Sequence, residues 1–166
     1  MSDMIVFPDE VVTSAPVHYV DLPHGAGIAA LITIDNGFDH TKPTTLGPKS
    51  LANIGSAFDE ALGRDDVVAV AVTGKPFIFA VGADLKVMQA GGTPAQAKAY
   101  FALGHDTFRK LRDAKVPTFA FINGAVMGGG LELALHAQYR TLSAGVPAIA
   151  FPEVFLGLVP GWGGSQ

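Results

Sequence analysis

The chain has 166 residues, of which 49% are hydrophobic and 16% charged, with a net charge of −4 and no cysteine. This length suits one domain with a buried core, and the lack of cysteine excludes disulfides, thiolate metal sites and a cysteine nucleophile. The acidic balance argues against a nucleic-acid partner, and no apolar run reaches the roughly 18 residues that a membrane span needs.

Strands and helices are predicted to alternate along the chain. Residues 1–16 form a polar, proline-punctuated lead-in, and residues 17–166 form one core domain. Short apolar runs predict strands at 17–20, 27–34, 67–73, 77–80, 116–122, 139–142 and 148–151. Helical spacing predicts helices at 49–62, 84–89, 94–113 and 131–137, with Thr93 as the expected cap and Pro94 as the first residue of the third. The repeated order of strand, strand and helix indicates an α/β fold.

The most informative segment contains three consecutive glycines, Gly128 to Gly130, followed by good helix formers. Glycines let a bound molecule approach the peptide N–H groups directly, and the first N–H groups of a helix lack partners within it. Glu132 is the one acidic residue in this otherwise apolar segment. Backbone donors beside a half-buried carboxylate indicate catalysis on a carbonyl that becomes an anion.

Several other polar residues have simpler interpretations. Thr73-Gly74-Lys75 lacks the earlier glycine of a phosphate-binding loop, so we interpret it as a simple turn. We expect Asp84 to cap its short helix and His136 to have a packing role. The remaining histidines show no metal-ligand spacing, so no metal is expected. At helical spacing, three residues are predicted to be core: Phe101, Phe108 and Leu111.

Three segments together resemble the crotonase superfamily, and within it the enoyl-CoA hydratases. Their order, content and spacing carry the resemblance: Gly82-Ala83-Asp84-Leu85-Lys86, then Gly128-Gly129-Gly130-Leu131-Glu132, then Phe151-Pro152-Glu153 and Pro160-Gly161-Trp162-Gly163-Gly164-Ser165-Gln166. The resemblance implies a spiral of repeated ββα units and a coenzyme A thioester as substrate. It therefore implies no separate cofactor, because coenzyme A is part of the substrate.

The resemblance also implies roles for individual residues. The N–H groups of Ala83 and Gly129 would form an oxyanion hole, and Glu132 and Glu153 would be the two catalytic glutamates. Residues implied at the acyl-CoA site are Ala83, Asp84, Leu85, Lys86, Gly129 and Gly161. Adding water to a double bond conjugated to a thioester puts negative charge on the thioester oxygen, and it needs a positioned acid and base. Which glutamate holds the proton at rest is open.

Three readings of function follow. The first is a 2-enoyl-CoA hydratase that forms 3-hydroxyacyl-CoA. Another is an isomerase or a different crotonase reaction, although such relatives usually keep only one of the two carboxylates. The third is a non-catalytic piece of a multifunctional fatty-acid oxidation protein. Relatives continue past Gly-Gly-Ser-Gln with helices that build a trimer, so we expect a full-length form to be a homo-oligomer (a trimer or a dimer of trimers). We also expect this chain to associate through its exposed apolar surface. The cysteine-free composition fits a cytoplasmic location.

Overall fold

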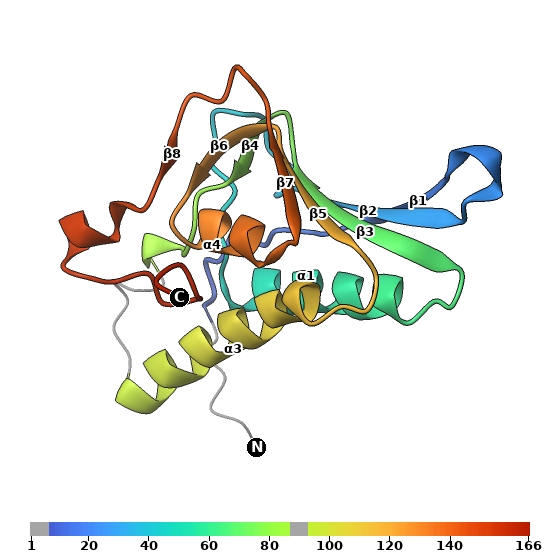
Figure 1. Cartoon of the computed structure of the whole chain (residues 1–166). Coiled ribbons are helices and arrows are strands. Elements are labelled where there is room, and N and C mark those ends of the chain that lie inside the picture. Colours follow the sequence, from blue (N-terminus) through green and yellow to red (C-terminus); the bar gives the residue numbers. More distant parts are fainter. Residues whose placement is uncertain (1–6, 87–92) are drawn as a thin grey trace.

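The computed structural model describes residues 7–86 and 93–166, and its helices and strands form an α/β fold (Figure 1). The first half contains β1 (Val17–Asp21), the 3₁₀ turn η1 (Pro23–Gly25), β2 (Ile28–Ile34), α1 (Pro48–Leu62), β3 (Val67–Gly74) and β4 (Phe77–Ala80). The second half contains α3 (Pro94–Arg112), β5 (Thr118–Ile122), β6 (Gly124–Met127), α4 (Gly129–His136), β7 (Tyr139–Leu142), β8 (Ile149–Ala150) and the 3₁₀ turn η2 (Pro152–Leu156). Residues 87–89 of the helix predicted at 84–89 lie outside the described residues.

The strands form two sheets, one of five strands in the order β1-β2-β3-β5-β7 and one of three in the order β4-β6-β8. Among the strand pairs of the described residues, only β1 and β2 run antiparallel. From β3 onward, the first strand of each repeat joins the larger sheet and the second joins the smaller one. This arrangement confirms the predicted α/β class, and the order β1β2α1, β3β4α3, β5β6α4 is the ββα repeat that the resemblance implied.

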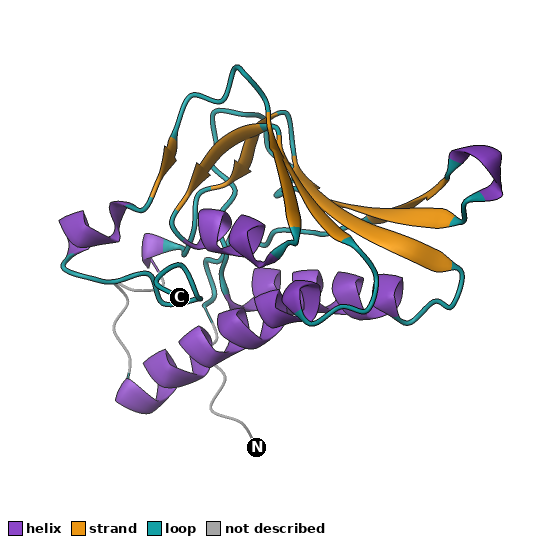
Figure 2. Cartoon of the chain, in the orientation of Figure 1, coloured by secondary structure: helices purple, strands orange, loops and turns teal. Residues whose placement is uncertain are grey.

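The helices pack on one side of the sheets, as Figure 2 shows. α1 covers the larger sheet with the apolar face that its spacing predicted, because Leu51, Ile54 and Phe58 are all fully buried. α3 packs against α1 and α4 and buries Phe108 and Leu111. Burying such side chains supplies most of the favourable free energy of folding.

The two long helices are capped at their N-termini in different ways. Thr93 and Gln96 form a capping box at α3, which confirms Thr93 as the predicted cap. At α1 the capping groups come from a distant residue, because the carboxylate of Glu10 accepts the N–H of Lys49 at 3.1 Å and that of Ser50 at 2.9 Å. The described part of the lead-in therefore packs on the core, and Thr13 is fully buried.

Candidate functional site

A pocket of about 440 Å³ opens where the strands of the smaller sheet end. The carboxyl ends of neighbouring parallel strands meet at one edge of a sheet, and this edge is where ligands bind in many α/β proteins. Ala83 follows β4, Gly129 follows β6 and Glu153 follows β8. Six of the predicted site residues line this pocket: Ala83, Leu85, Gly129, Glu132, Glu153 and Gly161.

Two predicted substrate-binding residues, Asp84 and Lys86, do not line the pocket. Asp84 is 7% exposed, and its Oδ1 accepts the N–H of Lys86 at 2.9 Å. This bond confirms that Asp84 caps the turn that follows it. Lys86 is exposed.

The N–H groups of Ala83 and Gly129 belong to two backbone segments in direct contact. A Cβ atom on Gly82 would lie 2.9 Å from the nitrogen of Gly129, so a side chain there would separate the segments. Among the hydrogen bonds between described residues outside the helix and strand ladders, none uses the N–H of Ala83 or Gly129. Gly129 is the first residue of α4, where an N–H has no partner within the helix. Two donors are therefore free beside the pocket.

Close backbone packing also requires glycine at two positions of the triplet. Gly128 has φ +50°, which favours glycine, and a Cβ on Gly130 would lie 2.1 Å from the carbonyl oxygen of Ala80. The start of α4 therefore lies directly against the end of β4. The helix predicted at 131–137 is confirmed, although it begins earlier, at Gly129.

Glu132 lies in the first turn of α4 and is only 2% exposed. Its Oε1 accepts two backbone N–H groups from the C-terminal segment, from Trp162 at 2.6 Å and from Gly164 at 2.9 Å. Burial raises the pKa of Glu132, and the charge of Glu153 adds to the effect. The two N–H bonds and His105 act in the opposite direction but do not cancel it.

Glu153 lies in η2 and also lines the pocket. A Cβ on Gly128 would come within 2.9 Å of its Oε1, so the carboxyl group lies against the backbone there. Its Oε2 is buried and has no hydrogen-bond partner among the described residues. A buried carboxylate oxygen without a partner is costly, and in this pocket a water or a substrate could supply one.

The structure adds residues to the site that the sequence analysis missed. Trp162 is 2% exposed, and its ring packs edge-on against Tyr100 and Phe108, with centroids 5.4 and 5.5 Å away. Phe101, which was predicted to be core, is only partly buried and lines the pocket, so that prediction was wrong in part. The signal available in the sequence was a single tryptophan within a glycine-rich segment.

His136 is buried beside this site rather than in it. Its Nδ1 lies 2.9 Å from the carbonyl oxygen of Glu132, and its ring packs edge-on against Phe108 with centroids 5.8 Å apart. Burial lowers the pKa of His136. These contacts agree with the packing role expected for it.

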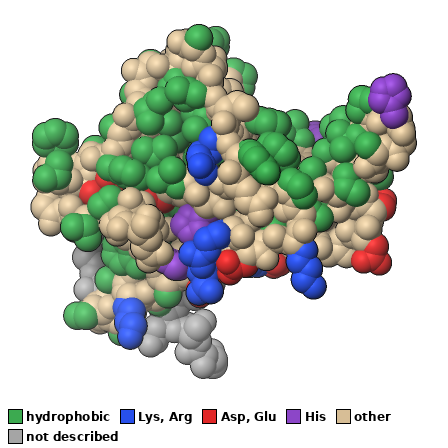
Figure 3. All heavy atoms as spheres, in the orientation of Figure 1, with side chains coloured by type: hydrophobic (Ala, Val, Ile, Leu, Met, Phe, Trp, Pro, Cys, Tyr) green, Lys and Arg blue, Asp and Glu red, His purple; other side chains and the backbone are tan. Residues whose placement is uncertain are grey.

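The outer wall of the pocket is apolar and strongly exposed. Phe155 is 88% exposed and Val159 is 77% exposed, and both line the pocket. Figure 3 shows hydrophobic side chains at the left end of the molecule, where η2 lies. Apolar walls around two carboxyl groups and two free N–H donors suit a ligand that joins an apolar chain to a carbonyl group.

In residues 7–86 and 93–166 no three histidine, aspartate or glutamate side chains gather as metal ligands would. Within the same ranges, no helix has the length and apolar character needed to cross a membrane.

Comparison with known proteins gives three findings. The family model described as enoyl-CoA hydratase/isomerase matches residues 26–166. The fatty acid oxidation complex subunit alpha of Shewanella sp. (strain W3-18-1) is 45% identical over 98 residues, which cover 58% of this chain and 14% of that protein. The equivalent Shewanella oneidensis protein is 44% identical over the same share. This chain therefore matches only a small part of its curated relatives.

Solved structures share the fold over most of this chain. DspI from Pseudomonas aeruginosa is 34% identical with a TM-score of 0.76, and the match covers 97% of this chain and 61% of that one. An enoyl-CoA hydratase from Bacillus anthracis is 25% identical with a TM-score of 0.73, covering 92% of this chain and 56% of that one. The crotonase-like fold implied by the three motifs is thereby confirmed.

Proposed function

Because this chain belongs to the enoyl-CoA hydratase/isomerase family, we propose that it adds water to a 2-enoyl-CoA thioester and forms a 3-hydroxyacyl-CoA. The observation that carries the proposal is the meeting of Glu132 and Glu153 in one pocket with the free N–H groups of Ala83 and Gly129. Each of the four groups has a separate task in this reaction.

The two N–H groups stabilise the thioester oxygen. When water attacks the β-carbon, the electrons of the double bond move towards the carbonyl, and the oxygen becomes an enolate. Ala83 and Gly129 each donate one N–H to this oxygen, a contribution of about 3 kcal/mol per donor in the transition state. Both donors are held by the backbone, so little reorganisation is needed as the charge develops.

The two carboxyl groups move the protons. One carboxylate accepts a proton from the attacking water, and the other carboxyl group gives its proton to the α-carbon, so the product gains the elements of one water. The raised pKa of Glu132 suits this work, because acid–base catalysis is most effective when the pKa approaches the working pH. The unpartnered Oε2 of Glu153 is free to bind the water. All steps use protein groups, so we propose no metal and no cofactor beyond the coenzyme A of the substrate.

Isomerisation of the double bond is the alternative within the family. Moving a double bond needs a proton removed from one carbon and returned to another, which a single carboxylate can perform. A second carboxyl group in the pocket, Glu153, has no necessary task in that reaction. Its presence favours hydration.

A non-catalytic role within a larger fatty-acid oxidation protein is the other alternative. The chain matches a segment of such subunits that amounts to 14% of their length. Both candidate glutamates and both candidate donors are nevertheless present, which favours an active site. We propose that an acyl-CoA is the ligand in either case, and that a full-length form is a homo-oligomer.

Separate incubations with crotonyl-CoA and with a 3-enoyl-CoA distinguish the three functions. Hydration increases the product mass by one water and removes the absorbance of the conjugated thioester. An isomerase converts a 3-enoyl-CoA to the conjugated 2-enoyl-CoA at constant mass. A chain that binds the thioester but gives neither product has the non-catalytic role. Glu132→Gln is the control for contaminating activity, because it removes one candidate proton carrier.

A further inference from the structure

Lys75 is a buried lysine that the proposed reaction does not use. It is 2% exposed, whereas lysine side chains are almost never fully buried. Its ammonium group donates to Asn36 Oδ1 at 2.6 Å and to the carbonyl oxygens of Phe38, Asp39 and Lys42 at 2.9, 2.8 and 2.7 Å. An ammonium group has three N–H donors, so these four oxygens more than satisfy it.

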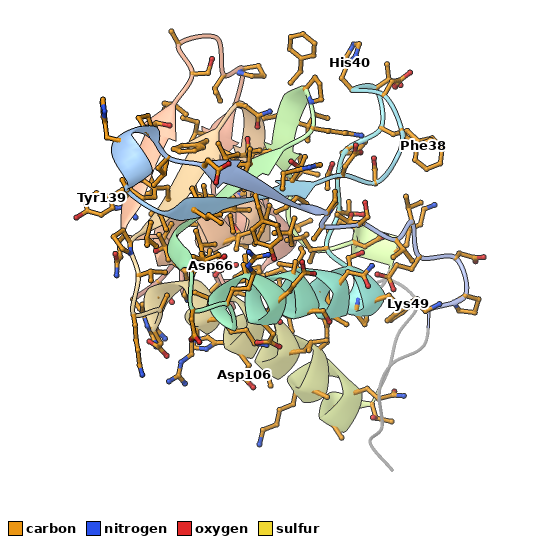
Figure 4. The ribbon with its side chains drawn as sticks, turned by 90° about the vertical axis from the view of Figure 1, so that its right-hand side faces the viewer. Phe38, His40, Lys49, Asp66, Asp106 and Tyr139 are labelled. Atoms are coloured by element: carbon orange, nitrogen blue, oxygen red, sulfur yellow. The ribbon has the colours of Figure 1, made fainter. Side chains whose placement is uncertain are left out.

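These contacts fold the loop of residues 36–43 around the ammonium group. The carbonyl oxygens of Phe38, Asp39 and Lys42 turn inward to Lys75. The side chains of Phe38 and His40 extend to the outside of this loop (Figure 4). Asn36 also donates through Nδ2 to the carbonyl oxygen of Pro43 at 2.9 Å. Since Pro43 lines the pocket, Lys75 fixes a loop that reaches the candidate site.

The residues that follow this loop hold the segment of the first N–H donor. The N–H of Val81 donates to the carbonyl oxygen of Thr44 at 2.9 Å, and the N–H of Leu46 donates to that of Gly82 at 2.9 Å. Ala83 comes directly after these two bonds. The position of its N–H therefore depends on where the loop lies.

Lys75 is also joined to the segment of the second donor. Asn123 donates through Nδ2 to the carbonyl oxygens of Gly74 at 2.8 Å and Lys75 at 2.9 Å, and its Oδ1 accepts the N–H of Gly74 at 3.1 Å. β6 begins at the next residue and leads to Gly129. The turn at Gly74 and Lys75 is therefore bonded both to the loop that holds the Ala83 segment and to Asn123, the residue before β6.

We propose that Lys75 is a positioning residue for the oxyanion hole, because its ammonium group fixes the loop that sets the N–H of Ala83 relative to that of Gly129. This inference rests on the proposed function, since it assumes that a thioester oxygen binds between the two donors. Lys75 itself touches no substrate and acts through the loop. A lysine that only stabilised the fold would leave the alignment of the donors unchanged in any variant that still folds.

A chromophoric thioester, 4-dimethylaminocinnamoyl-CoA, reports on this alignment. Its absorption band moves to longer wavelength when its carbonyl oxygen accepts hydrogen bonds, because its excited state carries more negative charge on that oxygen. The measurements are the band position and the Kd of the bound probe, together with kcat and KM for crotonyl-CoA. The wild-type chain is compared with Lys75→Met, which keeps the side-chain length and removes the charge.

Lys110→Met is the matched control. Lys110 also joins two segments, since its ammonium group binds Asp59 Oδ2 at 2.5 Å and the carbonyl oxygen of Gly55 at 3.4 Å, and it does not line the pocket. We expect Lys75→Met to lose at least half of the band shift and about tenfold or more in kcat, while the Kd of the probe changes by less than about threefold. Lys110→Met should keep the wild-type band shift and the wild-type kcat.

The outcomes separate this inference from the proposed function. If the probe shows no band shift in the wild-type chain, the proposed oxyanion hole is wrong. If the wild-type chain shifts the band and folded Lys75→Met shifts it equally, Lys75 has no positioning role. If Lys75→Met does not fold by circular dichroism, Asn36→Ala decides, because it removes one acceptor and the bond to Pro43. A full band shift in Asn36→Ala would then overturn the inference, and a reduced one supports it.

Discussion

Glu132→Gln is expected to lower activity and to raise stability at neutral pH. The amide oxygen of glutamine can accept the N–H groups of Trp162 and Gly164 in place of Oε1, so the contacts at 2.6 and 2.9 Å can be kept. The variant cannot exchange a proton, however. We expect kcat for crotonyl-CoA hydration to fall by about 10²-fold or more, with little change in the Kd of the thioester.

The gain in stability follows from the raised pKa of Glu132. Its ordinary value is 4.5, and burial raises it in the folded chain. The folded state therefore holds the proton more tightly than the unfolded state, so the favourable contribution is complete below about pH 4.5 and is lost as the pH rises through the folded-state pKa. Each unit of increase in the pKa corresponds to about 1.4 kcal/mol of stability lost at neutral pH. Glutamine stays neutral and avoids this loss.

Thermal unfolding measured from pH 4 to pH 8 tests this reasoning. For a chain of this length, 1.4 kcal/mol corresponds to a difference of about 3–6 °C in Tm. The Tm of Glu132→Gln minus that of the wild type should increase with pH and then level off. A difference that stays constant or decreases with pH would refute the burial argument, and a kcat within about threefold of the wild type would refute the role of Glu132 in proton transfer.

Three further predictions concern other parts of the site and the fold. Glu153→Gln should lower kcat by about 10²-fold and leave the Kd of the chromophoric thioester unchanged. A variant with normal kcat would contradict the two-carboxyl mechanism. In Gly129→Ala and Gly104→Ala the new Cβ would lie 2.2 and 2.4 Å from opposite parts of the Trp162 ring. Both should lose about 1–3 kcal/mol in denaturant unfolding, but only Gly129→Ala should reduce the band shift of the chromophoric thioester, and equal shifts in the two would contradict the donor role. Glu10→Ala removes the cap of α1 and should lower stability by about 1–2 kcal/mol with unchanged probe affinity.

Much of the fold could be predicted because local patterns agreed with the final packing. The run at 67–73 is β-branched and became β3, and the helix after Thr93 began where its cap and Pro94 indicated. β6 was not predicted, because the four residues Gly124–Met127 show no alternation of apolar and polar side chains. β6 pairs with β4, which lies more than 40 residues earlier in the sequence. Such a strand is defined by its neighbours rather than by its own sequence.

The candidate site was predicted only in part for a similar reason. The motifs predicted Ala83, Gly129, Glu132 and Glu153, and the structure brings them into one pocket, where their roles stay predictions. The N–H groups that bind Glu132 could not be predicted, because backbone donors look the same at every position of a sequence. Lys75 was interpreted as part of a simple turn, since the four oxygens that surround it belong to a loop more than 30 residues earlier.

The attachment of Glu132 to Trp162 has a consequence for sequence variation. The bond uses the main chain of residue 162, while the side chain of the same residue lines the pocket. Every amino acid except proline carries that N–H, so a change at position 162 alters the shape of the cavity and leaves the hydrogen bond to the carboxylate available. Gly164 lacks this freedom, because a Cβ there would lie 2.7 Å from Phe151. A substitution at position 162 therefore acts through the packing of a buried ring, whereas one at position 164 acts on the neighbouring Phe151 and Glu132 side chains.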